Sequence, residues 1–411
     1  MAEQSRPASL RAEPYRLLFP LGLASAWLGV SHWLLYGLGA LSAYSGLRHA
    51  LLMTEAMFSA FALGFLMTAV PRRTQTLPAH AVELVAATAA VVATALGAQL
   101  DRVVLSQAGF LAAMSVLLAF VVRRTEHPQA GRRPPNAFVL IPIGAAAGIA
   151  GAVAIARMAN GQGSLTTYLA GRELVQQGPF LCIVLGAGAL LLPLIEGLPP
   201  PPDAGATRGH RLARLGYAAL GLAIVATLVA DPSWPRAARA ARAALVTAGL
   251  VASRAGRWPR KPGLHRRAAA ASVWLVPAGL ALAAAFPDRA VAGLHVAFIG
   301  GLSLLVLAAS AHVAIGHGAR SEWMARNPRA VAAMVACVVA ATVLRATAHW
   351  WPEHLYALYA AAAALWLAGS VAWLVVFVLA ARPPGGGPKR KARRAAGRRA
   401  PRSGGVRVTG R

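Results

Sequence analysis

Long apolar stretches run through this chain from about Leu17 to Ala381, and Arg and Lys collect at every second gap between them. The stretches are too long and too poor in charge to be strands or helices of a soluble domain. Of the 411 residues, 57% are hydrophobic and only 13% are charged, and lipid can cover an apolar surface that a soluble fold could not bury. The pattern therefore predicts an all-α fold, a polytopic transmembrane helical bundle.

We predict about twelve transmembrane helices and no separate soluble domain. The expected limits of the spans are 17–40, 49–71, 78–97, 103–122, 136–157, 173–195, 211–230, 237–253, 265–286, 290–316, 328–348 and 354–381. The eighth is the least typical, because Arg239 and Arg242 fall near its start. The expected organisation is an N-terminal segment (1–16), a transmembrane domain (17–381) and a C-terminal tail (382–411).

The basic residues predict the orientation of the bundle. If the N-terminus is cytoplasmic, 32 of the 41 Lys and Arg residues lie on that side and 9 lie on the other. Leaving out the 11 basic residues of the tail still gives 21 against 9. Because cytoplasmic loops carry the excess of Lys and Arg, this asymmetry predicts an even number of spans and cytoplasmic termini.

The tail and the cysteines exclude several classes of function. The tail is rich in Gly, Pro, Arg and Lys, so we expect it to be disordered. Contact with anionic lipid is a simpler interpretation of its charge than nucleic-acid binding, and no nucleic-acid partner is predicted. Cys182 and Cys337 lie inside apolar stretches without a CxxC motif, which disfavours a disulfide framework, a thiolate zinc site and an iron–sulfur cluster.

Histidine is the polar residue best placed for chemistry. Five of the eleven histidines fall at or near the outer side in this topology: His32, His49, His295, His349 and His354. Neutral imidazole binds haem iron and copper well, and such sites in helical membrane proteins join helices that are distant in sequence. Topology alone leaves two interpretations open, a metal centre facing the outside or polar residues at the membrane interface without a ligand.

Two further histidines, His312 and His317, fall on the cytoplasmic side. Their i,i+5 spacing puts them about 140° apart on a continuous helix, so they would not share a face. A helix end near Gly316 or Gly318 would bring His317 round. A metal site and a structural role both remain open for this pair.

Acidic residues are scarce at membrane depth. Asp and Glu total 13, and Glu55 and Glu83 are the clearest examples within spans. A proton-coupled transporter usually needs several carboxylates along its path, so this supply is thin. Glu55 is a candidate for a buried proton carrier or for a bond to a neighbouring helix. The chain also has no His-His dipeptide, which disfavours a terminal oxidase or nitric oxide reductase subunit.

Three stretches of the chain carry a family resemblance. His49-Ala50 is followed by GFLMTAVP at 64–71, Leu294-His295 leads to GHGAR at 316–320, and Leu344-Arg345 precedes the apolar segment 355–378. These stretches, with the length and the number of spans, resemble the NnrS family of bacterial haem- and copper-containing membrane proteins. The family reads HAHEM before GFLLTAVP, and HALTVGAIG before LGHTGR. The resemblance runs over most of the chain.

Some positions depart from the family's pattern. Leu51 and Leu52 replace the second His and the Glu of HAHEM, and His312 stands where the family usually has an Arg before LGH. Arg72 and Arg73 follow the proline where the family has a Trp after Pro-Asn. The chain is therefore interpreted as a divergent member.

The resemblance implies haem and copper as cofactors and a location in the bacterial inner (plasma) membrane. It links the chain to the nitric oxide response and to denitrification, with nitric oxide or another nitrogen oxide as a partner besides the lipid bilayer. It assigns no turnover reaction. His49, His295 and His317 match the family's histidines, and His312 and His349 are added from position alone. We expect cofactor binding by His49, His295, His317 and His349, and metal ligation by His49, His295, His312 and His317.

A metal-free secondary transporter or permease is the alternative function. It predicts inverted repeats and broken helices around a midplane site. The sequence shows no convincing internal repeat, although Pro142, Pro193 and Pro277 are positioned to break helices. Metal content and substrate uptake would discriminate between the two functions.

Overall fold

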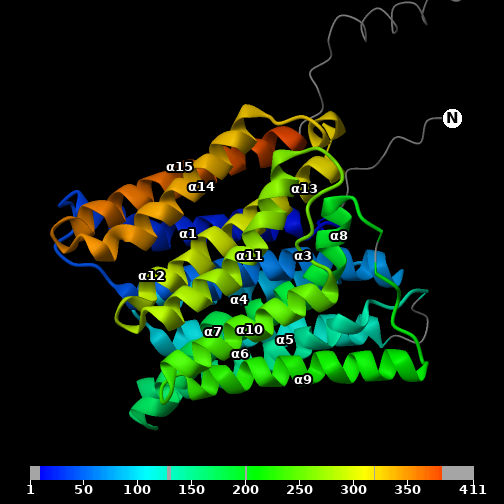
Figure 1. The fold of residues 1–411 in the computed structure, drawn as a ribbon, viewed down its shortest axis with the longest axis horizontal. Helices are drawn as coiled ribbons and strands as arrows, with labels where there is room; N and C mark the ends of the chain where they lie inside the picture. The colour runs from blue at the N-terminus through cyan, green and yellow to red at the C-terminus, as the bar shows by residue number, and fades with distance from the viewer. Residues whose placement is uncertain (1–9, 127–130, 200, 319, 382–411) are drawn as a thin grey trace, which may run out of the picture.

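A computed structural model describes residues 10–126, 131–199, 201–318 and 320–381. These residues form long helices that lie side by side in one bundle, and no strand occurs among them. The α14–α15 pair lies at one edge of the bundle and α9 at the opposite edge, while the short α8 crosses the helix direction at one end (Figure 1). The predicted all-α helical bundle is confirmed.

The helices follow the apolar stretches of the sequence. The first half of the bundle contains α1 (Tyr15–Gly37), α2 (Gly46–Ala50), the π-helix η1 (Leu51–Met57), α3 (Phe58–Thr74), α4 (Ala81–Gln99), α5 (Val103–Thr125), α6 (Leu140–Ala159), α7 (Leu165–Gly186) and α8 (Gly188–Glu196). The second half contains α9 (Arg208–Ala230), α10 (Pro235–Ser253), α11 (Leu264–Ala285), α12 (Ala290–His295), the π-helix η4 (Val296–Ser303), α13 (Leu304–His317), α14 (Arg329–Thr347) and α15 (Leu355–Ala381).

Among the described residues, ten helical segments are long and apolar enough to cross a membrane. The pair α7 and α8, bent by 54° at their junction, would make an eleventh span. The helix α10 occupies the predicted eighth span but carries Arg236, Arg239 and Arg242, which keep it outside that set. A polytopic bundle is therefore established, and the count of twelve stays a prediction.

The first and last described helices are antiparallel neighbours. The rings of Tyr15 and Phe377 lie 6.3 Å apart, and Gly37 packs against Ala360. We call the end where α1 begins and α15 ends the inner end, which the basic residues predict to be cytoplasmic, and the opposite end the outer end. The expected disordered tail (382–411) lies outside the described residues, as do positions 1–9 of the N-terminal segment.

One helix begins earlier than its sequence pattern indicates. The span expected at 173–195 is preceded by two further helical turns, because α7 starts at Leu165. The Ser164 side chain accepts a hydrogen bond from the Thr167 backbone N–H and caps the helix. Arg172 and Glu173 interrupt the apolar pattern there, which is why hydropathy alone places the start too late.

Small residues and aromatic rings hold the helices together. A side chain at Gly97 of α4 would overlap the Ser106 backbone of α5, so glycine permits this close approach. The indole N–H of Trp373 in α15 donates to the Ser310 hydroxyl at 2.8 Å, and that of Trp366 donates to Ser303 at 3.0 Å. These bonds tie α15 to the η4–α13 segment, which carries two of the predicted site histidines, His312 and His317.

Candidate functional site

Two of the predicted histidines lie at the outer end with the same hydrogen-bond arrangement. The Nδ1 atom of His49 lies 3.0 Å from the Gly29 carbonyl oxygen, and that of His295 lies 2.7 Å from the Val291 carbonyl oxygen. A carbonyl can only accept, so each Nδ1 carries the proton and each Nε2 is left with its lone pair. Metal-binding histidines are commonly oriented in this way.

A π-helix follows each of these histidines. The η1 segment begins two residues after His49, and the η4 segment begins directly after His295. Both segments continue without a break into a long α-helix, α3 or α13. π-Helical turns are rare and occur frequently at functional sites. Two of the three stretches that carry the family resemblance therefore share a local architecture that their sequences do not reveal.

A buried arginine, Arg345 of α14, contacts one of the outer histidines, His349. Arg345 is 8% exposed and lies over the Tyr359 ring, with its Cζ 3.8 Å from the ring centroid. The Nε2 atom of His349 lies 3.3 Å from an Arg345 nitrogen and 3.0 Å from the Tyr359 hydroxyl. His349 is thus held by protein partners, whereas within the described part of the chain the Nε2 atoms of His49 and His295 have no hydrogen-bond partner.

Each of the two outer imidazoles could offer Nε2 to a metal ion or to a haem iron. They come from separate helices, and in each ring a carbonyl oxygen holds the Nδ1 atom. Among the described residues, no group of three or more His, Cys, Asp or Glu side chains is arranged to hold a metal ion. A compact copper site with several protein ligands therefore does not follow from these side chains.

The other predicted pair lies at the inner end, beside a cavity of about 480 Å³. His312 and His317 both line this cavity, which is bounded by α3, α8 and α13. α13 continues without a break through His317, the case in which the two histidines were expected not to share a face. Both residues nevertheless line the cavity.

Each inner histidine has a defined partner. The Nδ1 atom of His312 lies 3.2 Å from Nε2 of His265, a fully buried residue of α11 that the sequence did not single out as its partner. The exposed His317 contacts the Arg72 guanidinium and packs on Tyr15, with the ring centroids 5.7 Å apart.

The acidic residue Glu13 anchors the polypeptide ahead of α1 to this inner end. Its carboxylate pairs with Arg16 and, at 3.0 Å, with Arg72 of α3. Burial acts to raise the pKa of Glu13, but the hydrogen bonds and charges of the two arginines prevail and hold this pKa below its usual value.

The two histidine groups are separated by most of a membrane. His49 binds Gly29 and His317 packs on Tyr15, and both partners belong to α1. The 14-residue separation between them corresponds to roughly 20 Å of helix. The four predicted metal ligands therefore belong to two places, His49 and His295 at the outer end and His312 and His317 at the inner end.

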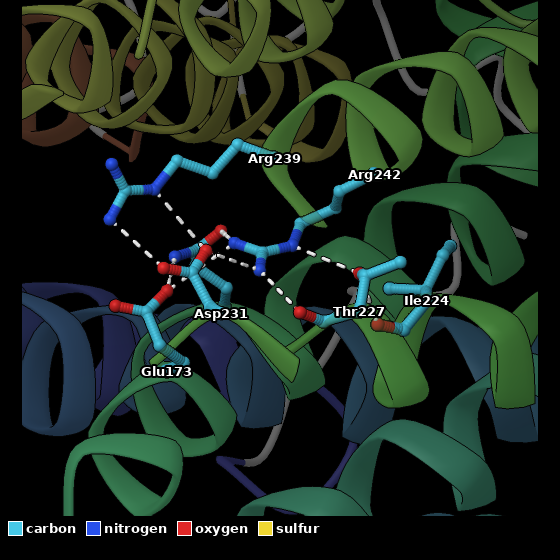
Figure 2. A network of polar contacts seen from close by, with 7 residues as sticks. Glu173, Ile224, Thr227, Asp231, Arg239 and Arg242 are labelled. Atoms are coloured by element: carbon cyan, nitrogen blue, oxygen red, sulfur yellow. Dashed lines mark hydrogen bonds and ion pairs between the residues drawn. The ribbon is translucent and has the colours of Figure 1, made fainter. Parts of the chain in front are cut away.

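Sequence reasoning missed a buried polar network between α7, α9 and α10 (Figure 2). Arg242 is completely buried and donates five hydrogen bonds, to Glu173, to Gln177, to Asp231 and twice to Thr227. Arg239 donates to both oxygens of Asp231. The three-residue spacing of the arginines on α10 places both on one helix face, the only local signal that could have indicated this network.

The predicted proton carrier Glu55 is also buried. It is 1% exposed in the η1 segment, and its carboxylate accepts a hydrogen bond of 2.8 Å from the Gln107 amide of α5. This contact is the bond to a neighbouring helix that the sequence left open as the alternative. Glu83, the other acidic residue noted within a span, pairs with Arg124 at the inner end, at 2.8 Å.

Comparison with known proteins places the chain in one family. The family model described as NnrS protein matches residues 9–383, which is nearly the whole chain. None of the curated proteins matches it.

Proposed function

Because the chain belongs to the NnrS family, we propose that it binds haem and copper in the membrane and acts in the bacterial response to nitric oxide and in denitrification. The observation that carries the proposal is the family match over residues 9–383, which includes all the histidines at issue. The hydrogen bonds of His49 and His295 support it, because each ring has Nδ1 held by a carbonyl and Nε2 without a partner among the described residues. The proposed location is the bacterial inner membrane.

In this proposal, His49 and His295 would hold a haem through their Nε2 atoms. A haem iron supplies affinity for nitric oxide and the capacity for one-electron chemistry. The protein supplies orientation, because Gly29 and Val291 hold the two rings by their Nδ1 atoms. Arg345 supplies a buried positive charge that favours anionic groups near the site. Copper rests on the family alone, since no three-ligand group occurs among the described residues.

The optical spectrum and metal content of the full-length purified protein test the proposal. Protein from metal-replete cells is expected to show Soret absorbance, and His49→Ala or His295→Ala is expected to reduce it by half or more. The matched control is His354→Ala, because His354 is an exposed histidine at the same end. Colourless, metal-free protein would contradict the proposal. If neither His49→Ala nor His295→Ala alters the spectrum, the haem is not bound by these histidines at the outer end.

One observation favours a second candidate, a metal-free secondary transporter or permease. The bend of 54° between α7 and α8 lies beside the inner cavity, which α8 lines with Leu190 and Leu194. Broken helices of this kind form substrate sites in transporters, although usually nearer the midplane. Substrate uptake by proteoliposomes that persists after both His49 and His295 are replaced would support the transporter.

A further inference from the structure

The inner cavity is lined by apolar residues and by arginines, and we call the part lined by Arg72, Arg73 and Arg132 its mouth. Phe65, Leu191 and Ile195 line it and also line a smaller apolar pocket of about 90 Å³, so the apolar surface continues between α3, α7 and η4. A volume of about 480 Å³ is within the range of pockets that bind small organic ligands. The cavity therefore has room for the body of an apolar ligand.

The mouth carries an excess of positive charge. Arg72, Arg73 and Arg132 line the cavity, and no Asp or Glu is among its described lining residues. Asp203 is not among these lining residues and pairs with both Arg73 and Arg132. Two arginines thus share one carboxylate, which leaves guanidinium donors available to an anion.

Several polar atoms beside the cavity have no partner among the described residues. The Arg73 side chain is only 9% exposed, and its buried Nε makes no hydrogen bond there. The Nδ1 atom of the fully buried His265 also has no hydrogen-bond partner there. An unmet buried donor costs about 1–3 kcal/mol, so the described residues satisfy Arg73 incompletely. When Nε2–H of His265 donates to Nδ1 of His312, the neutral His312 ring carries its proton on Nε2 and can donate it to a ligand in the cavity, and Nδ1 of His265 is then an acceptor.

We propose that the inner cavity binds an amphiphile with a carboxylate head and an apolar body. Arg73 and His312 hold the carboxylate, and the walls around Phe65 and Leu191 take the body. Two sources share this chemistry, a porphyrin with its propionates and a fatty acid from the membrane. The site is separate from the outer histidines. Only its porphyrin form rests on the proposed haem function.

Binding titrations with the full-length protein in phosphatidylcholine nanodiscs test the site. The probes are iron-free protoporphyrin IX and palmitate, each compared with its methyl ester, which has the same body without the negative charge. We expect each acid that binds to bind at least about tenfold more tightly than its ester, because a hydrogen bond to a charged group is worth about 1.5–3 kcal/mol. Binding of protoporphyrin alone would identify a porphyrin site, and binding of palmitate alone would identify a fatty-acid site.

Three variants sharpen the test. Arg73→Gln is expected to weaken binding of the acid about tenfold or more and to leave the ester unchanged. Asp203→Asn is expected to tighten binding of the acid, because it removes the carboxylate that competes for Arg73 and Arg132. Arg123→Gln is the matched control, since Arg123 lies at the inner end, has a 70% exposed side chain and is not among the lining residues.

The proposal is overturned if acid and ester bind equally, if neither acid binds, or if Arg73→Gln weakens acid and ester alike. The result is independent of the outer haem. Protein that lacks Soret absorbance but binds palmitate through Arg73 would refute the proposed function and keep this site. Protein that contains haem but binds acid and ester equally would support the proposed function and refute this site.

Discussion

Arg242 and Arg73 are in opposite situations in the bundle. Arg242, in the network of Figure 2, donates all five of its N–H groups to protein partners. Arg73, at the inner cavity, pairs with Asp203, but its buried Nε has no hydrogen-bond partner among the residues that the structure describes. An arginine whose N–H groups are all hydrogen-bonded to protein has none left to donate to a ligand, whereas an arginine with an unpaired N–H group does. We therefore assign the first to stability and the second to binding.

The same substitution at both arginines gives the largest expected difference. Arg242→Gln is expected to lower the free energy of unfolding by about 3–5 kcal/mol, because it leaves Asp231 and Glu173 short of charge partners in a buried place. Arg73→Gln is expected to lower it by less than about 1 kcal/mol, because Arg132 still pairs with Asp203 at the half-exposed mouth. Detergent unfolding titrations of the two variants measure both values. Equal losses would remove the distinction between the two arginines.

The acidic partners allow a second, smaller comparison. Asp231 is 3% exposed and accepts from both Arg239 and Arg242, so Asp231→Asn is expected to cost about 1–3 kcal/mol of stability. The side chain of Asp203 is 31% exposed, and Asp203→Asn is expected to cost less than about 1 kcal/mol. Thermal unfolding of the two variants under the same conditions measures the difference. A greater loss for Asp203→Asn would show that the mouth is held together by its own ion pairs.

These clusters also mark the limit of what the sequence predicts. Hydropathy located the helices because each span must be apolar along its own length, a local property. The partners of Arg242 are not local, since Glu173 lies 69 positions away and reaches it only after α7 and α10 pack. The arginines of α10 therefore make the span predicted at 237–253 look less typical. In the folded protein, Asp231 and Glu173 pair with two of them, Arg239 and Arg242. The same limit explains the late predicted start of α7, where Glu173 interrupts the apolar pattern.

The sequence predicts at which end of the bundle each candidate histidine lies, but not which residues the histidine contacts. Counting spans assigns His49 and His295 to one end of the bundle and His312 and His317 to the other. In the structure the two pairs lie at these ends. The hydrogen bonds to Gly29 and Val291 and the contact of His312 with His265 depend on tertiary packing or ring orientation. The η1 and η4 segments have no local marker in the sequence, because an extra residue in a helical turn is favoured by contacts rather than by composition.

The smallest effect concerns Glu13, whose pKa is held below its usual value by Arg16 and Arg72 despite burial. A lowered folded pKa means that Glu13 stabilises the protein at pH values above its unfolded pKa of about 4.3, and that this stabilisation is lost as the pH falls through the folded pKa. Glu13→Gln should therefore lower the unfolding temperature at pH 7, and the difference from wild type should shrink as the pH falls below about 4.3. Glu126→Gln is the matched control, since Glu126 is an exposed carboxylate at the inner end. Melting curves from pH 7 to pH 3 measure the effect, and a difference that stays constant with pH would mean that Glu13 acts through packing rather than through its charge.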